Sequence, residues 1–248
     1  CLPFLYVELV KAGRFDDVLR ISKTYDDLRT GRLEVAEGLA ERGRLNEARD
    51  LADDALEDAI DQDWAVRRMV LILVKGGAFE EALEKAKQLL EIGSEVDYYE
   101  ALRDISEALA KARKLDDALS LVQTIDEEQA RLEALVRICQ GLSESGEIET
   151  AIDVAGEIKD DHKRSEALYH ASRALVKRGM LNVVINTALP RMDHYYRLET
   201  TGLIVRTYVE EERIEKATEL VTSSYAEPDR ILHLAEIYSA VKSRKISV

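Results

Sequence analysis

Apolar positions along the chain follow a helical spacing that is interrupted by a polar turn at regular intervals. From Gly141 to Ile158 the sequence reads GLSESGEIETAIDVAGEI, with apolar residues every three or four positions on both sides of the turn. This spacing places the apolar side chains on one face of a helix. Closely similar stretches are LVKAGRFDDVLRIS, LAERGRLNEARDLA, LVKGGAFEEALEKA, LAKARKLDDALSLV, LVKRGMLNVVINTA and YVEEERIEKATELV. The pattern predicts a series of helix–turn–helix units.

The turn of each unit is marked by a glycine or by a residue that takes its place. These positions are Gly13, Gly43, Gly77, Arg113, Gly146, Gly179 and Glu212, and subtracting neighbours gives spacings of 30, 34, 36, 33, 33 and 33 residues. A recurring period of this length is typical of solenoid proteins. We expect a left-handed backbone at the turn, which suits glycine and costs about 1–2 kcal/mol at other residues. An eighth unit, with Arg244 at the turn position, begins and stops.

Positions at the same distance from the turn in every unit form a column, and four such columns predict which side chains are buried. Four and eight residues before the turn lie large apolar residues, such as Leu39 and Val35, on one face of a first helix. Five and nine residues after the turn lie mostly small residues, such as Ala48 and Ala52, on one face of a second helix. One such hairpin has apolar residues on too many sides to fold alone, whereas stacking buries them against the next hairpin.

The fold class predicted is therefore all-α. The expected architecture is a right-handed α–α superhelix, or solenoid, of about seven units of about 33 residues. Residues 1–248 are predicted to form a single repeat domain. The apolar start, LPFLYVELV, and the abrupt end, KSRKISV, are not the polar caps that solenoids need. We expect these ends to continue in a longer protein, or to pair with another copy or another protein.

The columns resemble the tetratricopeptide repeat over essentially the whole chain. The resemblance rests on the turn glycine, the leucine four residues before it and the alanine five residues after it. The chain departs from that family in having small residues late in the second helix and almost no closing proline. The resemblance implies a scaffold that binds a peptide or a partner protein in a concave groove lined by first helices. Its carboxylate-clamp specificity is not expected, because Asn46, Asn182 and Asn186 all fall on second helices.

The pentatricopeptide repeat is similar too, and would imply binding of single-stranded RNA. That family reads bases with Asn, Thr or Ser about ten positions before the turn. Those positions here hold Leu33, Arg67, Arg103, Val136, Tyr169 and Gly202. The net charge of −14 also repels phosphates. Protein binding is therefore the first hypothesis and RNA binding the alternative.

Candidate groove residues come from the predicted first helices. The residues singled out are Glu100, Glu133, Glu166 and Glu199, a ladder at 33-residue spacing, together with Arg173, Arg206 and Tyr169. The glutamate ladder favours a partner with basic groups. A second interpretation is that each carboxylate only complements the dipole at its helix N-terminus, by about 0.3–1 kcal/mol. A parallel ladder of arginines at 131, 164, 197 and 230 follows Glu127, Asp160 and Asp193 by four residues, which predicts salt bridges that include pairs between repeats. The alternative is that these arginines contact an anion or a carboxylate of a partner.

Other functions find little support in the sequence. The chain lacks a Gly-rich phosphate loop, a nucleophile elbow and an HExxH motif, so we predict no enzyme, no metal site and no cofactor. Cys139 is expected in the core rather than as a nucleophile. No apolar run reaches the 18 residues or more of a membrane span. With Cys1 and Cys139 as the two cysteines, the composition favours a reducing, cytoplasmic location.

Overall fold

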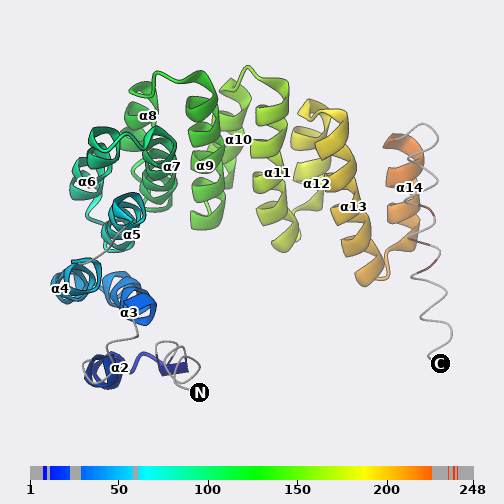
Figure 1. Cartoon of the computed structure of the whole chain (residues 1–248). Coiled ribbons are helices and arrows are strands. Elements are labelled where there is room, and N and C mark those ends of the chain that lie inside the picture. Colours follow the sequence, from blue (N-terminus) through cyan, green and yellow to red (C-terminus); the bar gives the residue numbers. More distant parts are fainter. Residues whose placement is uncertain are drawn as a thin grey trace. The chain divides into compact units, whose positions relative to one another are not determined.

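Every regular element in the described part of the chain is a helix, so the all-α prediction is confirmed (Figure 1). The computed structural model describes residues 8–9, 12–22, 29–57 and 61–224, together with residues 234, 237 and 239. The predictions made for both chain ends, for position 230 of the arginine ladder and for the eighth unit at Arg244 lie outside these residues. None of the helices described is both long and apolar enough to cross a membrane.

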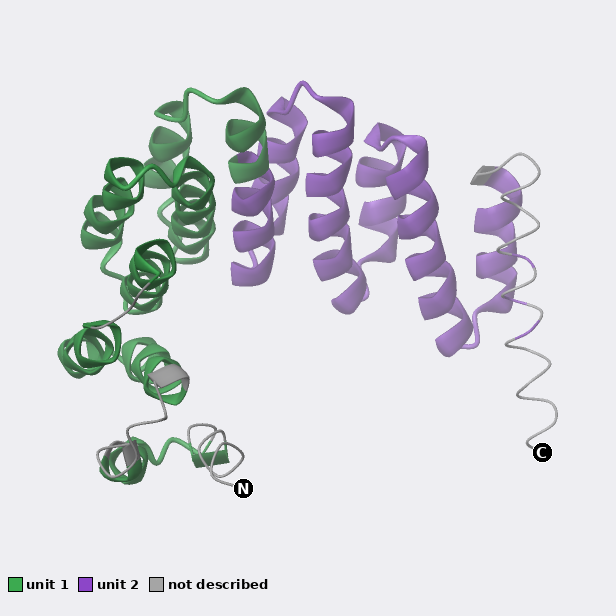
Figure 2. Ribbon diagram, in the orientation of Figure 1, with its two compact units in different colours: residues 1–134 green, residues 135–248 purple. Residues whose placement is uncertain are grey.

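The chain divides into two compact units, Cys1–Ala134 and Leu135–Val248 (Figure 2). The first contains α2 (Phe15–Ser22), α3 (Arg29–Glu41), α4 (Leu45–Leu56), α5 (Gln62–Lys75), α6 (Phe79–Glu91), α7 (Glu95–Lys111) and α8 (Leu115–Gln123). Helix α9 (Glu128–Ser145) spans the boundary. The second contains α10 (Ile148–Glu157), α11 (Asp161–Lys177), α12 (Leu181–Val183), η1 (Val184–Ala188), η2 (Leu189–Arg191), α13 (His194–Glu210) and α14 (Ile214–Ser224). The single repeat domain over residues 1–248 stays a prediction.

Helices pack as the sequence predicts, in pairs joined by the expected turns. In the first unit α3 packs on α4, α5 on α6 and α7 on α8, and in the second unit α13 packs on α14. First helices also contact each other, because α5 touches both α3 and α7 in one unit and α11 touches α13 in the other. The core therefore lies between successive hairpins as well as within each one.

Burial follows the predicted columns. The column five residues after the turn is fully buried throughout and consists of Val18, Ala48, Ala82, Ala118, Ala151, Val184 and Ala217. The column four residues before the turn is buried from Leu39 to Tyr208. Small residues in the second helix allow the neighbouring backbone to approach, while large residues from the first helix fill the remaining space.

The turns have the predicted left-handed backbone. Gly179 has a φ of 72°, and Arg113 and Glu212 each adopt a φ of 62°. In the turn after α11, the Gly179 N–H donates to the Val176 carbonyl at 2.9 Å and the Met180 N–H to the Leu175 carbonyl at 3.0 Å. This pair of hydrogen bonds closes the helix C-terminus and satisfies its last carbonyls. The leucine four residues before the turn recurs for a different reason, because its side chain is buried, as that of Leu175 is.

Replacing Glu212 by glycine is expected to stabilise the protein by about 1 kcal/mol, because glycine adopts a positive φ without steric penalty. The matched opposite change is Gly179→Ala. A β-carbon at Gly179 would meet nothing within 4 Å, so the backbone conformation alone should destabilise this variant by a similar amount. Urea denaturation followed by circular dichroism measures both. Shifts of the same sign would show that turn conformation does not control stability.

One second helix departs from the regular pattern. The segment after Gly179 forms a short α-helix, then a π-helical turn over Val184–Ala188 and a 3-10 turn over Leu189–Arg191. Pro190 lies in the last of these. Proline has no N–H and clashes with the preceding turn, so it ends the regular helix. The buried positions Val184 and Ala188 are nevertheless kept in register.

Candidate interaction surface

Three of the first helices begin with the same aspartate cap. Asp61, Asp160 and Asp193 accept hydrogen bonds from the backbone N–H three residues later, at 3.1, 2.7 and 2.9 Å. A capping carboxylate satisfies an otherwise unpaired N–H and complements the helix dipole. The caps fix where α5, α11 and α13 start, and therefore which side chains the first turn presents.

The arginines of the ladder donate to backbone carbonyls, a contact that the sequence did not predict. Arg131 donates to the Ile125 carbonyl at 2.9 Å, Arg164 to the Ile158 carbonyl at 3.3 Å and Arg197 to the Met192 carbonyl at 2.6 Å. The acidic residues four positions earlier are used as helix caps, so their oxygens face the helix N-terminus. Each arginine therefore holds the linker that leads into its own first helix.

In the first unit the glutamate ladder is neutralised by arginines of the preceding repeat. Arg67, whose side chain is only 16% exposed, lies 3.5 Å from Glu100 and 3.0 Å from Asp104. Arg103 pairs with Glu100 at 3.2 Å and with Glu133. Because Glu100 and Glu133 are held in ion pairs, they are better explained as links between repeats than as a free acidic strip.

These pairs had a signal in the sequence that the prediction missed. Arg67 and Arg103 stand ten residues before their turns, while each glutamate stands thirteen residues before the next turn. Taken one repeat at a time, these arginines indicate only that the position does not hold a base-reading residue. Opposite charges in these two columns of successive repeats indicate cross-repeat pairing once first helices lie side by side.

In the second unit, other residues occupy the column that holds Arg67 and Arg103 in the first unit. The position ten residues before the turn holds Val136, Tyr169 and Gly202. Glu166 is paired with Lys163 of its own helix at 3.1 Å, and Glu199 is exposed. The Arg173 guanidinium lies over the Tyr169 ring, 5.8 Å from its centroid. The same column therefore supplies an aromatic ring here instead of a counter-charge.

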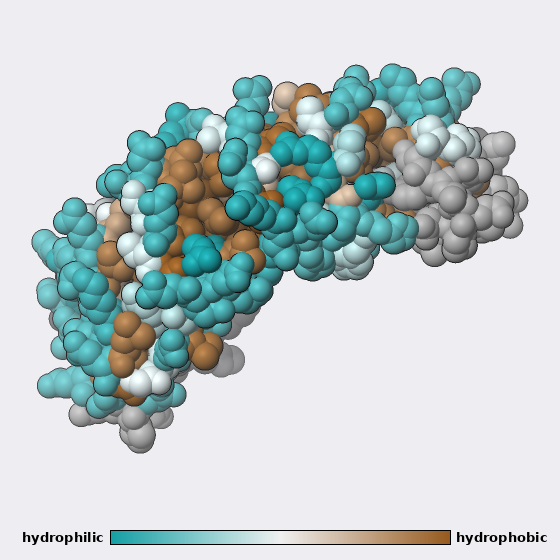
Figure 3. Space-filling model, turned by 90° about the horizontal axis from the view of Figure 1, so that it is seen from above, coloured by the Kyte–Doolittle hydropathy of each residue, from teal (hydrophilic) through white to brown (hydrophobic). Residues whose placement is uncertain are grey.

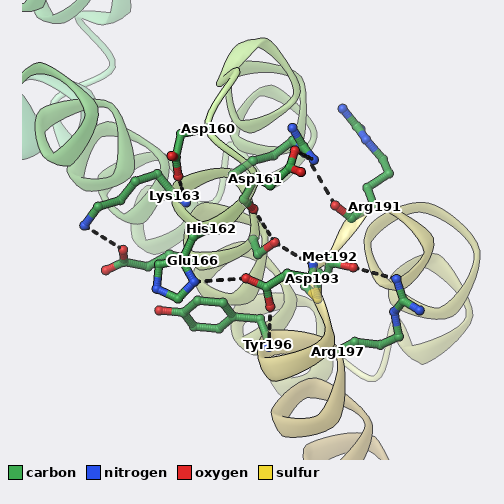
Figure 4. Close-up of polar contacts among 12 residues, drawn as sticks. Asp160, Asp161, His162, Lys163, Glu166, Arg191, Met192, Asp193, Tyr196 and Arg197 are labelled. Atoms are coloured by element: carbon green, nitrogen blue, oxygen red, sulfur yellow. Dashed lines mark hydrogen bonds and ion pairs between the residues drawn. The ribbon is translucent and has the colours of Figure 1, made fainter. Parts of the chain in front are cut away.

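Aromatic rings of α11 and α13 meet beside this position. The Tyr196 ring lies 5.2 Å from His162, 5.6 Å from Tyr169 and 5.0 Å from Tyr195, measured between centroids. His162 also binds Asp193 through Nδ1 and Oδ2 at 3.0 Å (Figure 4). We call this surface the α11–α13 face and define it as His162, Glu166, Tyr169, Arg173, Tyr195, Tyr196, Glu199 and Arg206.

Two ionisable groups of the α11–α13 region have shifted pKa values. Desolvation, reinforced by the negative charge of Glu166, raises the pKa of Tyr196 to about 12, so its phenol stays protonated. Burial alone would raise the pKa of Asp193, but the Tyr196 N–H and the His162 ring together lower that pKa below its ordinary value of 3.8. The two rings and the cap are thus one electrostatically linked group.

Removing the Asp193 cap is expected to destabilise α13. Asp193→Ala should lower the free energy of unfolding by about 1 kcal/mol, whereas Asp193→Asn should lose much less because asparagine caps equally well. Urea denaturation measures both variants. Equal losses would mean that the charge, rather than the cap, stabilises this helix start.

The pH dependence separates the two roles further. Because the pKa of Asp193 is lowered in the folded protein, its contribution to the free energy of unfolding is complete above pH 3.8. This contribution is lost as the pH falls through the native pKa. In Asp193→Asn this part of the acid-induced loss should be missing. An unchanged acid profile in that variant would contradict the assignment.

Large apolar side chains are exposed in both units. The most exposed are Val96 at 74% and Tyr195 at 59%, and Trp64 is exposed at 42%. The space-filling view shows hydrophobic residues open to solvent between hydrophilic ones (Figure 3). Tyr195 belongs to the α11–α13 face, where its ring contacts that of Tyr196. Exposed aromatic rings beside charged groups are typical anchors of protein interfaces.

The remaining candidate groups are structural or dispersed. Cys139 is buried, and desolvation raises the pKa of its thiol to about 12, so it stays protonated in the core, where we expected it. Within the described residues, no group of three or more His, Cys, Asp or Glu side chains could hold a metal ion.

Comparison with known proteins identifies no family for this chain. No protein-family model matches it, and no curated protein matches it significantly.

Proposed function

We propose that this protein is an interaction module of the tetratricopeptide-like type. In this proposal the hairpins form a right-handed superhelix, and the first helices line a groove that receives a peptide or a partner protein. The regular turns, the buried small-residue column and the side-by-side first helices within each unit support the architecture. A stack of this kind presents the same positions of successive first helices on one continuous surface.

The observation that carries the proposal is the α11–α13 face. Five of the seven predicted groove residues lie on these two contacting helices, namely Glu166, Tyr169, Arg173, Glu199 and Arg206. Arg173, Glu199 and Arg206 are exposed, and the caps and the linker-binding arginines hold the helices that carry them. The face thus combines rigid aromatic rings with charges of both signs, as protein-binding surfaces do.

The glutamate ladder supports a basic partner only in part. Glu100 and Glu133 are occupied by arginines, so the case for binding a basic group rests mainly on Glu199. Single-stranded RNA remains the alternative ligand, and it is disfavoured by the net charge of −14. The absence of an enzymatic activity and a cytoplasmic location stay predictions.

Affinity capture from a native extract, with and without nuclease, tests the proposal. The protein itself is the bait, as the wild type and as a face variant that carries Glu199→Lys and Arg206→Glu. This pair of changes keeps the net charge and alters the α11–α13 face. A matched control bait carries Lys216→Glu and Glu219→Lys, which are exposed on the second helix α14. We expect a stoichiometric protein that survives nuclease, binds the control bait and is lost from the face variant. Capture of RNA, or equal capture by both variants, would overturn the proposal.

A further inference from the structure

A cavity of about 370 Å³ lies between α9 and α11 in the second unit. Gln140 and Glu144 of α9 line one side, and Arg173 and Lys177 of α11 line the other, together with Arg178, which directly follows α11. We call it the α9–α11 cavity. It adjoins the α11–α13 face, because Arg173 belongs to both.

The charge of this cavity is opposite to that of the chain. Asp and Glu outnumber Lys and Arg by 49 to 35 in the sequence, yet Glu144 is the one acidic residue in the lining beside three cationic ones. Arg173 and Lys177 are exposed, and neither reaches a carboxylate of the described residues within ion-pair distance. Most arginines and lysines of α3–α7 have such a partner, as Arg67 and Lys75 do.

Two of the cations are held in place by neighbours that leave their charge available. Arg178 donates to the Gly146 carbonyl at 3.4 Å, and a β-carbon on Gly146 would lie 2.7 Å from the Arg178 Nη2. The guanidinium therefore rests against the turn that follows α9. Arg173 is supported by the Tyr169 ring, 5.8 Å from its centroid. Positioned cations lose less conformational freedom when an anion binds.

The acidic residue of the lining, Glu144, is hydrogen-bonded to a neighbour on its own helix. Gln140 donates through Nε2 to Glu144 at 3.1 Å and accepts from Arg137 at 3.2 Å. This chain of contacts runs along α9. The i,i+4 spacing of Arg173 and Lys177 places both cations on the same side of α11.

We propose that the α9–α11 cavity binds the side-chain carboxylates of an acidic segment in the partner protein. The inference rests on the proposed function and adds the chemistry of the ligand at one place in the groove. Three cations around a space of this size suit one or two carboxylates. A long polyanion such as RNA would also meet the acidic surface around the cavity, which disfavours it. Guanidinium groups bind carboxylates in a bidentate fork, which adds specificity to the charge attraction.

Fluorescence anisotropy of the full chain with a labelled hexaglutamate peptide, capped at both ends, tests this proposal. The end caps exclude recognition of a terminal carboxylate. The test variant is Lys177→Glu, and the control is Lys216→Glu, which makes the same charge change on α14 of the same unit. We expect Lys177→Glu to weaken binding by about tenfold, as loss and reversal of an exposed ion pair should, and added salt to weaken the wild type. The control should stay within about twofold.

Several outcomes would overturn it. These are no binding of hexaglutamate, equal losses in the two variants, or tighter binding of a six-nucleotide single-stranded RNA that Lys177→Glu abolishes. A partner captured by the wild type and retained equally by Lys177→Glu would also refute the cavity assignment. That last result would leave the proposed function intact, because the capture depends on Glu199 and Arg206.

Discussion

Replacing Leu168 by alanine should lower the free energy of unfolding by about 3 kcal/mol, the loss typical of a fully buried leucine. Leu168 lies on α11 with 0% exposure. The loss combines the transfer of the missing methyl groups from water with the cavity that the rigid surroundings leave open. Urea denaturation followed by circular dichroism measures the change. Lys177→Ala is the control, because this exposed residue of the same helix should change stability by no more than about 0.5 kcal/mol.

The Leu168 variant also tests how cooperative the repeats are. In a stacked array each hairpin is stabilised by its neighbours, so a local defect weakens the adjacent units first. Hydrogen exchange read by mass spectrometry should show protection lost in α10, α11 and α13 before α5 and α6. Uniform loss along the chain would indicate a single cooperative unit, and would contradict a solenoid with local stability.

Replacing Arg67 by methionine should destabilise the first unit by about 2 kcal/mol, because the change removes a mostly buried guanidinium that pairs with three carboxylates of α7. Methionine keeps an unbranched apolar stem, so the change isolates the guanidinium. Arg67 contacts Asp97, Glu100 and Asp104, and only 16% of its side chain is exposed. The carboxylates that remain would repel each other across α7.

The control for Arg67 is Arg14→Met. Arg14 also pairs with an aspartate, but its side chain is 63% exposed, so the variant should lose no more than about 0.5 kcal/mol. Added salt should recover part of the Arg67→Met loss by screening the carboxylates, and should leave the control nearly unchanged. Equal losses in the two variants would mean that burial of Arg67 contributes nothing.

Local patterns in the sequence determined the helices, their turns and their buried faces. The leucine column, the alanine column and the glycine at the turn each act within a few residues, through helical periodicity and the steric freedom of glycine. Leu39, Ala48 and Gly43 therefore had predictable roles. Even the turn at Glu212 was predictable, because the flanking columns force a backbone that the residue itself disfavours.

The tertiary structure alone decided which partners the polar side chains take. Arg67 pairs with Glu100, 33 residues away, and Arg178 reaches the Gly146 carbonyl, 32 residues away. Arg131 contacts a linker carbonyl instead of the nearby Glu127. Long charged side chains have several partners within reach, and the choice depends on how neighbouring helices stack and on which groups the helix caps already occupy. The α9–α11 cavity exists for the same reason, since it forms only where two helices distant in sequence lie side by side.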